Sequence, residues 1–295
     1  MDIREASKLT GVQSKFLDDN IDLLIKSYNE FIGTFIEINN LQGINLLLRV
    51  TCRNPYDSPL FGYFSRLFLF ENSIQSNLLP EIVNIDDIQY EAINFILVKY
   101  NLQKTIKIQT HKTPSIINKV ILNIIKSSYF MLSDWFWPKV IRIKKVPKGD
   151  VIYVDTFLQL STIDQKGFFT DRHYFKHQKF LPNQAINQEW FAPTLNSIKY
   201  PSDYIKIFKR IKKSKTKFLI QESWLTFTDY LFSFLMAIVI PMRKMKFNDI
   251  NGLPVDNITK AVIFSDIGST QLMKAIYRYR FIKRLAINKI NVQTA

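Results

Sequence analysis

The side chains best suited to chemistry gather in one central stretch, residues 151–174. It opens with a β-branched and aromatic run, residues 151–154, which predicts a strand that ends on the carboxylate of Asp155. Beyond a polar loop come four polar or amphipathic side chains in a row: Asp171, Arg172, His173 and Tyr174. Ligands of open α/β sheets bind beyond the carboxyl ends of strands, so this arrangement predicts a site. The alternative is that Asp155 caps the next element and that Asp171 and Arg172 form a surface pair.

Two weaker groups of candidates lie on either side of this stretch. Glu222 stands in an apolar run, residues 218–240, that predicts one helix. An acid there must be paired, protonated or turned toward a cavity, which makes Glu222 a catalytic candidate. A loop between a predicted strand and a predicted helix contains Arg53, Tyr56, Asp57 and Ser58. Such loops hold anionic groups in α/β proteins, although ordinary turn chemistry explains the same residues.

Apolar periodicity predicts the elements that would position these side chains. Strands are expected at 44–52, 81–87, 105–110 and 151–154, and helices at 12–38, 60–74, 88–100, 115–131, 218–240 and 259–287, with a further helix from Ser202. Within this pattern residues 230–241 predict a buried helix, and residues 189–195 close an irregular segment. Strands that alternate with helices indicate an α/β fold, a parallel sheet flanked by helices.

The formal net charge of +15 calls for an anionic partner: nucleic acid, an anionic membrane face or a phosphorylated substrate. The single cysteine, Cys52, excludes a disulfide framework and a cysteine-rich zinc site. His173 and His177 have i, i+4 spacing, but this pattern alone is too weak to predict a metal. We find no secretory signal and no run of the ~18 apolar residues that cross a bilayer, so we expect a cytoplasmic protein, soluble or peripheral.

Two basic segments, residues 129–148 and 206–217, have the chemistry of contact surfaces. In the first, aromatic residues lead directly into clustered cations, a mixture that suits an anionic membrane interface or a single strand of nucleic acid. A core-packing aromatic helix with a solvated basic tail is the alternative. The second segment is a basic run on a predicted helix, and such runs are usually solvated faces.

Several common motifs are missing from the sequence. It has no P-loop, no GxGxxG fingerprint, no GxSxG elbow and no DxD triplet. No helix-turn-helix, zinc-finger or ribonucleoprotein signature accompanies the basic charge, which argues against nucleic acid as the partner.

Four segments taken together resemble a known group of enzymes: NPYDSPLFGYFSRLFLFE at 54–71, VDTFLQL with GFFTDRHYF at 154–175, EWFAPTL at 189–195 and YRYRFIKRL at 277–285. Their order resembles the LIC-type transferases of bacterial O-antigen and capsule clusters, which are similar to the retaining β-Kdo glycosyltransferases. The resemblance implies a GT-B architecture of two Rossmann-like domains. Residues 1–258 would be the acceptor-side domain, and residues 259–295 an amphipathic helix leading toward a C-terminal domain that this chain lacks.

The same resemblance implies an activity: transfer of a Kdo-like sugar from a nucleotide-activated donor, such as a CMP-sugar, to a lipid-linked surface glycan at the inner face of the plasma membrane. It implies no cofactor and no metal. Asp155 or Asp171 would be the carboxylate nucleophile, and Arg172 and His173 would stabilise the sugar carboxylate or the donor phosphate. Tyr174 and Glu189 lie in the matching segments as substrate contacts.

The competing interpretation is a basic, non-enzymatic α/β module that binds RNA or an anionic membrane. Binding that is driven by phosphate contacts weakens steeply with salt, whereas a transferase consumes an activated donor. A magnesium-dependent nuclease is a third interpretation, and the lack of an acidic cluster with a nearby lysine counts against it.

Overall fold

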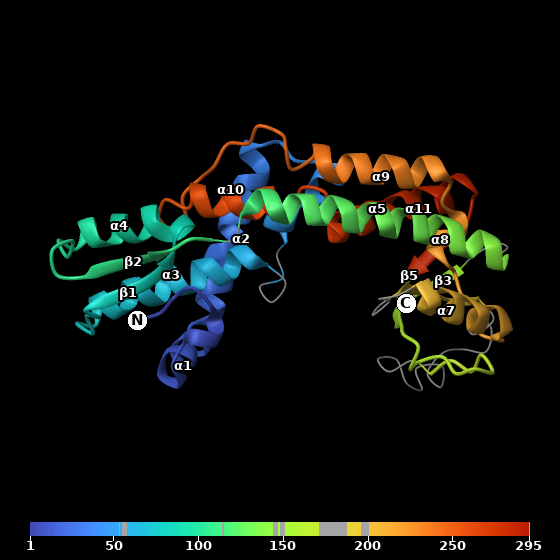
Figure 1. Cartoon of the computed structure of the whole chain (residues 1–295), viewed down its shortest axis with the longest axis horizontal. Helices are drawn as coiled ribbons and strands as arrows, with labels where there is room; N and C mark the ends of the chain where they lie inside the picture. The colour runs from blue at the N-terminus through green and yellow to red at the C-terminus, as the bar shows by residue number, and fades with distance from the viewer. Residues whose placement is uncertain are drawn as a thin grey trace. The chain divides into compact units, whose positions relative to one another are not determined.

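The computed structural model describes residues 1–52, 54, 58–113, 115–143, 147, 151–170, 188–195 and 201–294. These residues form a mixed α/β protein with short parallel sheets, which confirms the predicted α/β class (Figure 1). The chain divides into two compact units. Unit 1 comprises Met1–Ile125 and Ala237–Leu272, and unit 2 comprises Lys126–Met236 and Met273–Ala295. The domain organisation implied by the resemblance, with a further domain beyond residue 295, stays a prediction.

The elements alternate along the chain, with 3-10 helices written as η. The helices are η1 (Ala6–Lys8), α1 (Gly11–Asp19), α2 (Ile21–Ile38), η2 (Gly43–Leu47), η3 (Arg49–Thr51), α3 (Pro59–Gln75), η4 (Asp87–Gln89), α4 (Tyr90–Lys99), α5 (Ile116–Ile141), α7 (Pro201–Lys213), α8 (Gln221–Trp224), α9 (Phe227–Val239), α10 (Asp256–Ser265) and α11 (Thr270–Ile287). The strands are β1 (Ile82–Asp86), β2 (Lys107–His111), β3 (Val151–Leu158), β4 (Glu189–Leu195) and β5 (Val292–Thr294). The chain passes between the units within α5, α9 and α11.

Local capping chemistry sets the starts of two N-terminal helices. Thr10 and Gln13 form a capping box at α1, in which the Gln13 backbone nitrogen donates to the Thr10 hydroxyl at 3.3 Å. Ser58 caps α3 by accepting from the Phe61 backbone nitrogen at 3.3 Å, and Pro59 takes the first helical position. The predicted helices at 12–38 and 60–74 are confirmed, although the first is divided into α1 and α2.

The strand predicted at 44–52 is wrong, because this segment forms the 3-10 turns η2 and η3. The Thr51 hydroxyl hydrogen-bonds the carbonyl oxygens of Leu46 and Leu48 at 2.7 and 2.8 Å. Polar groups that are satisfied locally compete with a strand ladder. Leu48 and Val50 are fully buried in the core of unit 1, so the apolar pattern reflects burial and not a strand.

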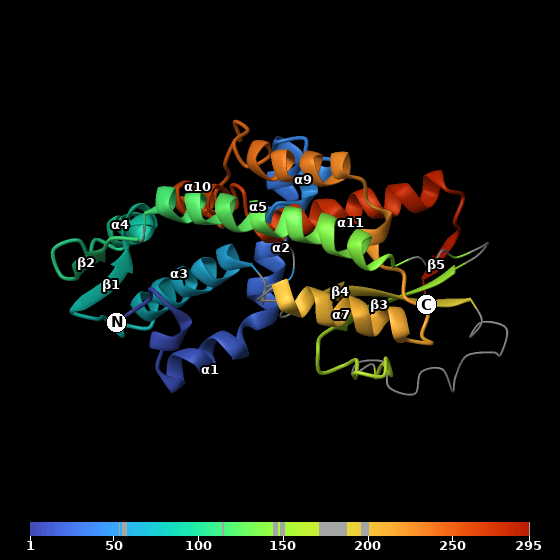
Figure 2. The same cartoon turned by 45° about the vertical axis from the view of Figure 1, so that its right-hand side comes forward.

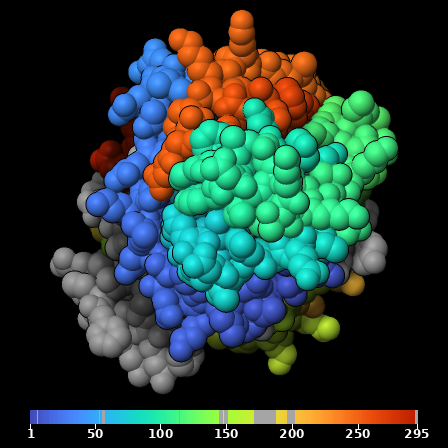
Figure 3. All heavy atoms as spheres, turned by 90° about the vertical axis from the view of Figure 1, so that its left-hand side faces the viewer, coloured from blue at the N-terminus to red at the C-terminus, as the bar shows by residue number. Residues whose placement is uncertain are grey.

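The sheet of unit 1 consists of β1 and β2, which pair in parallel with Asp86 opposite His111. The crossover between them runs through η4 and α4, so the predicted strand, helix and strand at 81–110 are confirmed. Because the strands are parallel, their carboxyl ends lie at the same edge. α10 packs beside α4, where Asn257 donates to Glu91 at 2.8 Å, and the two adjoin on the face shown in Figure 3.

The sheet of unit 2 is also parallel, with β3 between β4 and β5. A parallel bridge between Phe191 and Phe218 continues it beyond β4. α7 lies along one face, where Tyr204 and Phe208 join the apolar cluster formed by Leu158 and its neighbours (Figure 2). The β3–β4 pair therefore buries one face under α7.

Two predictions about this sheet are wrong. Residues 189–195 are the strand β4, where the sequence predicts an irregular segment. β3 does not end at Asp155 but continues to Leu158, because Thr156 and Leu158 maintain the alternation of buried side chains.

The single helix predicted at 218–240 is wrong as well. Phe218 lies beside β4, the short α8 follows, and α9 begins at Phe227. Asp229 defines this start, because its carboxylate accepts from the Thr226 backbone nitrogen at 3.0 Å. The prediction that residues 230–241 form a buried helix is also wrong, since Leu231 and Leu235 of α9 are 39% and 49% exposed.

The remaining helices differ from their predictions in length. α5 continues to Ile141, well beyond the predicted end at residue 131, and accommodates Pro138 within it. The helix predicted at 259–287 is interrupted at Gly268, which separates α10 from α11. Among the helices of the described chain, none is both long and apolar enough to cross a bilayer.

Gly268 provides the first test. Its φ is +64°, its nitrogen donates to the Ala237 carbonyl at 2.9 Å, and a Cβ there would lie 2.7 Å from Ile124 Cγ1. We expect Gly268→Ala to lower the free energy of unfolding by about 1–3 kcal/mol through backbone strain and overpacking, measured by urea denaturation. Gly33→Ala is the matched control, because Gly33 lies within α2 with nothing within 4 Å of the added Cβ. It should stabilise by up to about 1 kcal/mol, and a loss as large as that of Gly268→Ala would contradict the argument.

Candidate functional site

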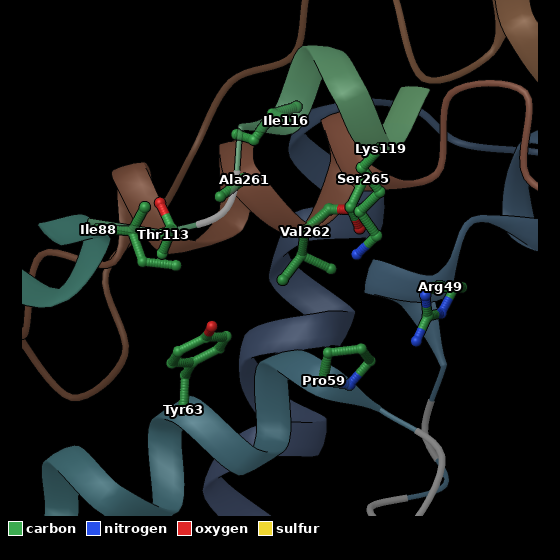
Figure 4. Close-up of a pocket in the computed structure, with 10 residues that line it drawn as sticks. All are labelled: Arg49, Pro59, Tyr63, Ile88, Thr113, Ile116, Lys119, Ala261, Val262 and Ser265. Atoms are coloured by element: carbon green, nitrogen blue, oxygen red, sulfur yellow. The ribbon is translucent and has the colours of Figure 1, made fainter. Parts of the chain in front are cut away.

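The candidate site is a cavity of about 190 Å³ in unit 1. Its wall is formed by Arg49, Pro59, Tyr63, Ile88, Thr113, Ile116, Lys119, Ala261, Val262 and Ser265. Figure 4 shows Tyr63 and Pro59 below Val262, with Arg49 and Lys119 at one end and Ile88 and Thr113 at the other.

The position of the cavity follows from the parallel pairing of β1 and β2. β1 ends at Asp86 and β2 at His111, and the residues just beyond these ends reach the cavity wall. The Thr113 hydroxyl donates to the Asp87 carboxylate at 2.7 Å, which ties the two strand exits together. Ligands of parallel α/β sheets bind at this edge.

Two helices begin at the cavity. Pro59 is the first residue of α3 and Ile116 the first of α5, and both belong to the wall. The amino end of a helix carries partial positive charge and free N–H groups, which favour an anion. The wall is therefore polarised before any side-chain charge is considered.

The charged residues of the described wall are Arg49 and Lys119, both cations. Behind Arg49 lies Asp266, which is fully buried and accepts from the Arg49 backbone nitrogen at 2.9 Å. The Arg49 guanidinium stands 3.6 Å from the other carboxylate oxygen, too far for a strong hydrogen bond. Burial raises the pKa of Asp266 to about 6, against the opposing effects of Arg49 and Lys119. Arg49 is thus held in place by its backbone, while its guanidinium remains able to bind a second anion.

A buried cation, Arg66, lies behind Tyr63. The Arg66 guanidinium stacks on the Tyr63 ring at 4.7 Å, and its Nε lacks a hydrogen-bond partner among the described residues. Burial lowers the pKa of Arg66 and raises those of Tyr63 and Asp86. The Tyr63 hydroxyl on the cavity wall is protonated at neutral pH, as an ordinary phenol is, and can donate a hydrogen bond.

Unit 2 contains a different polar cluster, built around two buried acids. Asp134 of α5 and Glu222 of α8 are 1% and 3% exposed. The Tyr204 hydroxyl donates to Asp134 Oδ1 at 2.6 Å, and the Tyr230 hydroxyl reaches the backbone carbonyls of Asp134 and Glu222 at 3.1 and 3.3 Å. Burial, and then repulsion by Asp134, raises the pKa of Glu222 to about 7. Burial also raises the pKa of Asp134, against the attraction of Lys274.

Of the three alternatives for Glu222, paired, protonated or turned toward a cavity, the cluster favours the protonated carboxyl. Glu222 Oε2 has no partner within the described chain, and Gln221 donates to Oε1 at 3.2 Å. A carboxyl so enclosed holds its proton up to neutral pH. Its role as a catalytic group stays a prediction.

Asp155 lies in the middle of β3 and not at a strand exit. Its carboxylate pairs with Arg278 of α11 at 2.6 Å, and the same guanidinium nitrogen donates to the Thr194 hydroxyl of β4 at 2.9 Å. Arg278 therefore spans the two neighbouring strands. Since the side chain of Asp155 is 54% exposed, the pair is open to solvent and to a ligand.

The other predicted site residues divide into two groups. Glu189 opens β4 opposite Ile152 and is buried. Outside the described residues lie Arg53, Tyr56, Asp57, Asp171, Arg172, His173 and Tyr174.

Sequence reasoning missed Arg49, Tyr63 and Lys119. Arg49 was hidden in the segment predicted as a strand, and the other two lie on predicted helices with no local signal of function. The usable signal was the Ser58–Pro59 helix start, because Pro59 belongs to the cavity wall.

No family model, curated protein or solved structure matches the chain. Among the described residues, no group of three or more His, Cys, Asp or Glu side chains could hold a metal ion.

Glu222 yields a prediction on the pH dependence of stability. Its pKa is raised from 4.5 to about 7 in the folded state. The protonated Glu222 carboxyl therefore stabilises the folded state fully below about pH 4.5, and this stabilisation is lost as the pH rises through about 7. Between pH 4.5 and pH 8 the wild type should lose up to about 3 kcal/mol of unfolding free energy through Glu222, and Glu222→Gln should not. We therefore expect the variant to melt at a higher temperature than the wild type at pH 8 but not at pH 4.5. Ser223→Ala, a neutral exchange at the next position, should keep the wild-type slope, and a parallel slope in Glu222→Gln would refute the assignment.

Proposed function

We propose that this chain is a glycosyltransferase, or the acceptor-side portion of one, that transfers a sugar from a nucleotide-activated donor. In this proposal its strand–helix units belong to a Rossmann-like half of a GT-B enzyme. The observation that supports it best is the cavity of unit 1, which is lined by Arg49, Lys119 and Tyr63 and is reached by the residues just beyond the carboxyl ends of β1 and β2. The resemblance of residues 54–71 supports it too, because this segment includes Ser58, Pro59 and Tyr63.

The cavity suits a small anionic sugar. Two cations and a hydroxyl can hold a phosphate or carboxylate group, while Ile88, Val262 and Ala261 supply an apolar wall for a sugar ring. About 190 Å³ lies below the roughly 300–1,000 Å³ of pockets for larger ligands. We therefore assign the anionic group of the sugar acceptor to this cavity and not a whole nucleotide sugar.

The chemical step would follow the retaining pattern. A carboxylate attacks the anomeric carbon as the nucleotide phosphate leaves, and the acceptor hydroxyl then displaces that carboxylate. Asp155 or Asp171 is the proposed nucleophile, with Arg172 and His173 on the sugar carboxylate or the departing phosphate. The ion pair between Asp155 and Arg278 supports this role for Asp155, because the guanidinium orients a solvent-accessible carboxylate. The proposed donor is a CMP-activated, Kdo-like sugar, and the proposed acceptor a lipid-linked glycan at the cytoplasmic face of the membrane.

The second candidate function is a basic module that binds RNA. The outer side of α7 favours it, because Lys206, Lys209, Lys212 and Lys213 are exposed there. Part of this basic segment is structural, however: Arg210 donates to the Leu160 and Ile163 carbonyls at 2.7 Å each.

Ligand-induced stabilisation tests the cavity. We expect inorganic phosphate or sugar phosphates to raise the melting temperature, as a ligand at a hundred times its Kd adds about 2.7 kcal/mol. Lys119→Ala should weaken the effective ligand by about tenfold, and Arg49→Lys should weaken it while keeping a cation near Asp266. Lys26→Ala, an exposed lysine of α2, is the control and should bind as the wild type does. Stabilisation by a short RNA alone, abolished by added salt, would favour the second candidate.

Sugar transfer tests the chemistry separately. We expect Asp155→Asn or Asp171→Asn to abolish transfer from the CMP-activated donor, with the melting temperature of each variant close to that of the wild type. The readout is radiolabelled sugar in the acceptor fraction. Full transfer by both variants would refute the assignment of the nucleophile. If only Lys119→Ala lost transfer, the cavity and not these carboxylates would determine the activity.

A further inference from the structure

Two packed helices of unit 2 present an apolar surface to solvent. α5 and α9 meet where the Trp135 and Phe227 rings lie 5.2 Å apart, edge to face. Large apolar side chains on their outer sides are 36–54% exposed: Tyr129, Leu132, Phe136 and Val140 of α5, and Phe227, Leu231, Phe232 and Leu235 of α9. We call these eight residues the α5–α9 surface. Figures 1 and 2 both show the two helices side by side.

The polarity of these helices is inverted relative to a helix on a water-facing surface. An ordinary surface helix turns its apolar stripe inward and its charges outward. Here the inward positions hold Asp134 and Ser133 on α5 and Asp229 and Ser233 on α9, all 8% exposed or less. The outward positions on α5 recur at 129, 132, 136 and 140, the spacing of a single helix face. Contiguous exposed apolar surface of this kind marks a contact site.

The charge on the surface has one sign. The acids of these two helix segments, Asp134 and Asp229, are buried and bound by Tyr204 and by Arg280, respectively. Lys126 and Lys139 of α5 are exposed, and the Lys139 ammonium lies 4.6 Å above the Trp135 ring. Apolar and aromatic side chains flanked by lysines are the composition of helices that lie in the interface of an anionic membrane.

We propose that the α5–α9 surface inserts into the interfacial layer of an anionic phospholipid bilayer, with both helices lying in the membrane plane. Leu132, Phe136, Leu231 and Leu235 enter the acyl boundary, and the two lysines meet lipid phosphates. The proposal narrows the membrane contact predicted at 129–148 to one helix face and adds α9. It drops residues 206–217 as an inserting segment, because the described side chains of α7 include no large exposed apolar residue.

A second copy of the chain fits this surface less well than a membrane does. An isologous dimer brings the same patch against itself, so Lys126 and Lys139 would enter an interface whose helices offer no exposed acid. An anionic bilayer satisfies the apolar residues and the lysines together. The inference rests on this surface alone and does not depend on glycosyl transfer.

Vesicle flotation of the full chain tests the proposal. We expect the wild type to float with vesicles of phosphatidylcholine mixed with phosphatidylglycerol, and more weakly with phosphatidylcholine alone. Leu132→Glu combined with Leu235→Glu should lower the partition coefficient by about tenfold or more, because it places acids where side chains enter the bilayer. Leu78→Glu combined with Val98→Glu is the matched control, since these residues are 72% and 49% exposed in unit 1. All four positions are exposed, so the variants should melt close to the wild type.

A second pair of variants separates the electrostatic contribution. Lys126→Glu combined with Lys139→Glu should reduce binding to the anionic vesicles and remove the salt dependence of that binding. Lys206→Glu combined with Lys209→Glu on α7 should leave most of the binding intact. The proposal is overturned if the wild type fails to float, or if the α5–α9 variants and the unit 1 control bind equally. It is also overturned if light scattering without vesicles shows a dimer that the Leu132/Leu235 variant dissolves, which would make the surface a contact between copies.

Discussion

Unit 2 depends on the burial of one carboxylate, that of Asp134. A buried acid must be hydrogen-bonded or protonated. The Tyr204 hydroxyl of α7 donates to the Asp134 carboxylate at 2.6 Å, and the Tyr230 hydroxyl of α9 donates to the backbone carbonyl of Asp134 at 3.1 Å. Tyr277 of α11 packs edge-on against the Tyr230 ring at 4.8 Å. A second buried acid, Asp229, joins α9 to α11 through ion pairs. Arg280 and Arg284 donate to its carboxylate at 2.9 Å through their Nε atoms. Removing one partner of such a network leaves a buried polar group unsatisfied, which is why these helices form one cooperative set.

Elements with strong local signals could be predicted from the sequence. Ser58 before Pro59 marks the start of α3, and the alternation of β1, α4 and β2 gives the parallel pairing in unit 1. The failures occurred where tertiary contacts decided. Residues 44–52 are apolar because they are buried, yet their backbone bonds are satisfied locally in 3-10 turns. Phe218 and its neighbours have helical apolarity, but the edge of β4 draws them into the sheet. Periodicity alone cannot separate a short buried strand from a buried helix.

The candidate site shows the same division. The sequence offers the loop before Ser58 as an anion site, with ordinary turn chemistry as the alternative, on the basis of a strand at 44–52 that the structure does not contain. The helix start at Pro59 is confirmed, and Pro59 belongs to the cavity wall. Arg49 and Lys119 could not be predicted, because they become neighbours only when η3 and the beginning of α5 pack beside α10. Asp155 is predicted to end its strand, but it lies within β3, where its side chain is 54% exposed. Its contact with Arg278 joins residues far apart in the sequence, and no local pattern contains that information.

The buried acids and the exposed apolar surface have a common physical origin. A helix has a limited circumference, so side chains turned inward to complete a polar network displace apolar ones toward solvent. On α9, Asp229 and Ser233 occupy the inner side, and Leu231 and Leu235 are left on the outer side. In water this arrangement loses the burial of each exposed leucine, about 1–2 kcal/mol apiece. A second apolar phase recovers that loss, and the interfacial layer of a membrane does so without requiring either helix to span it. The buried polar groups of α5 and α9 thus account for the exposed apolar surface on which the membrane proposal rests.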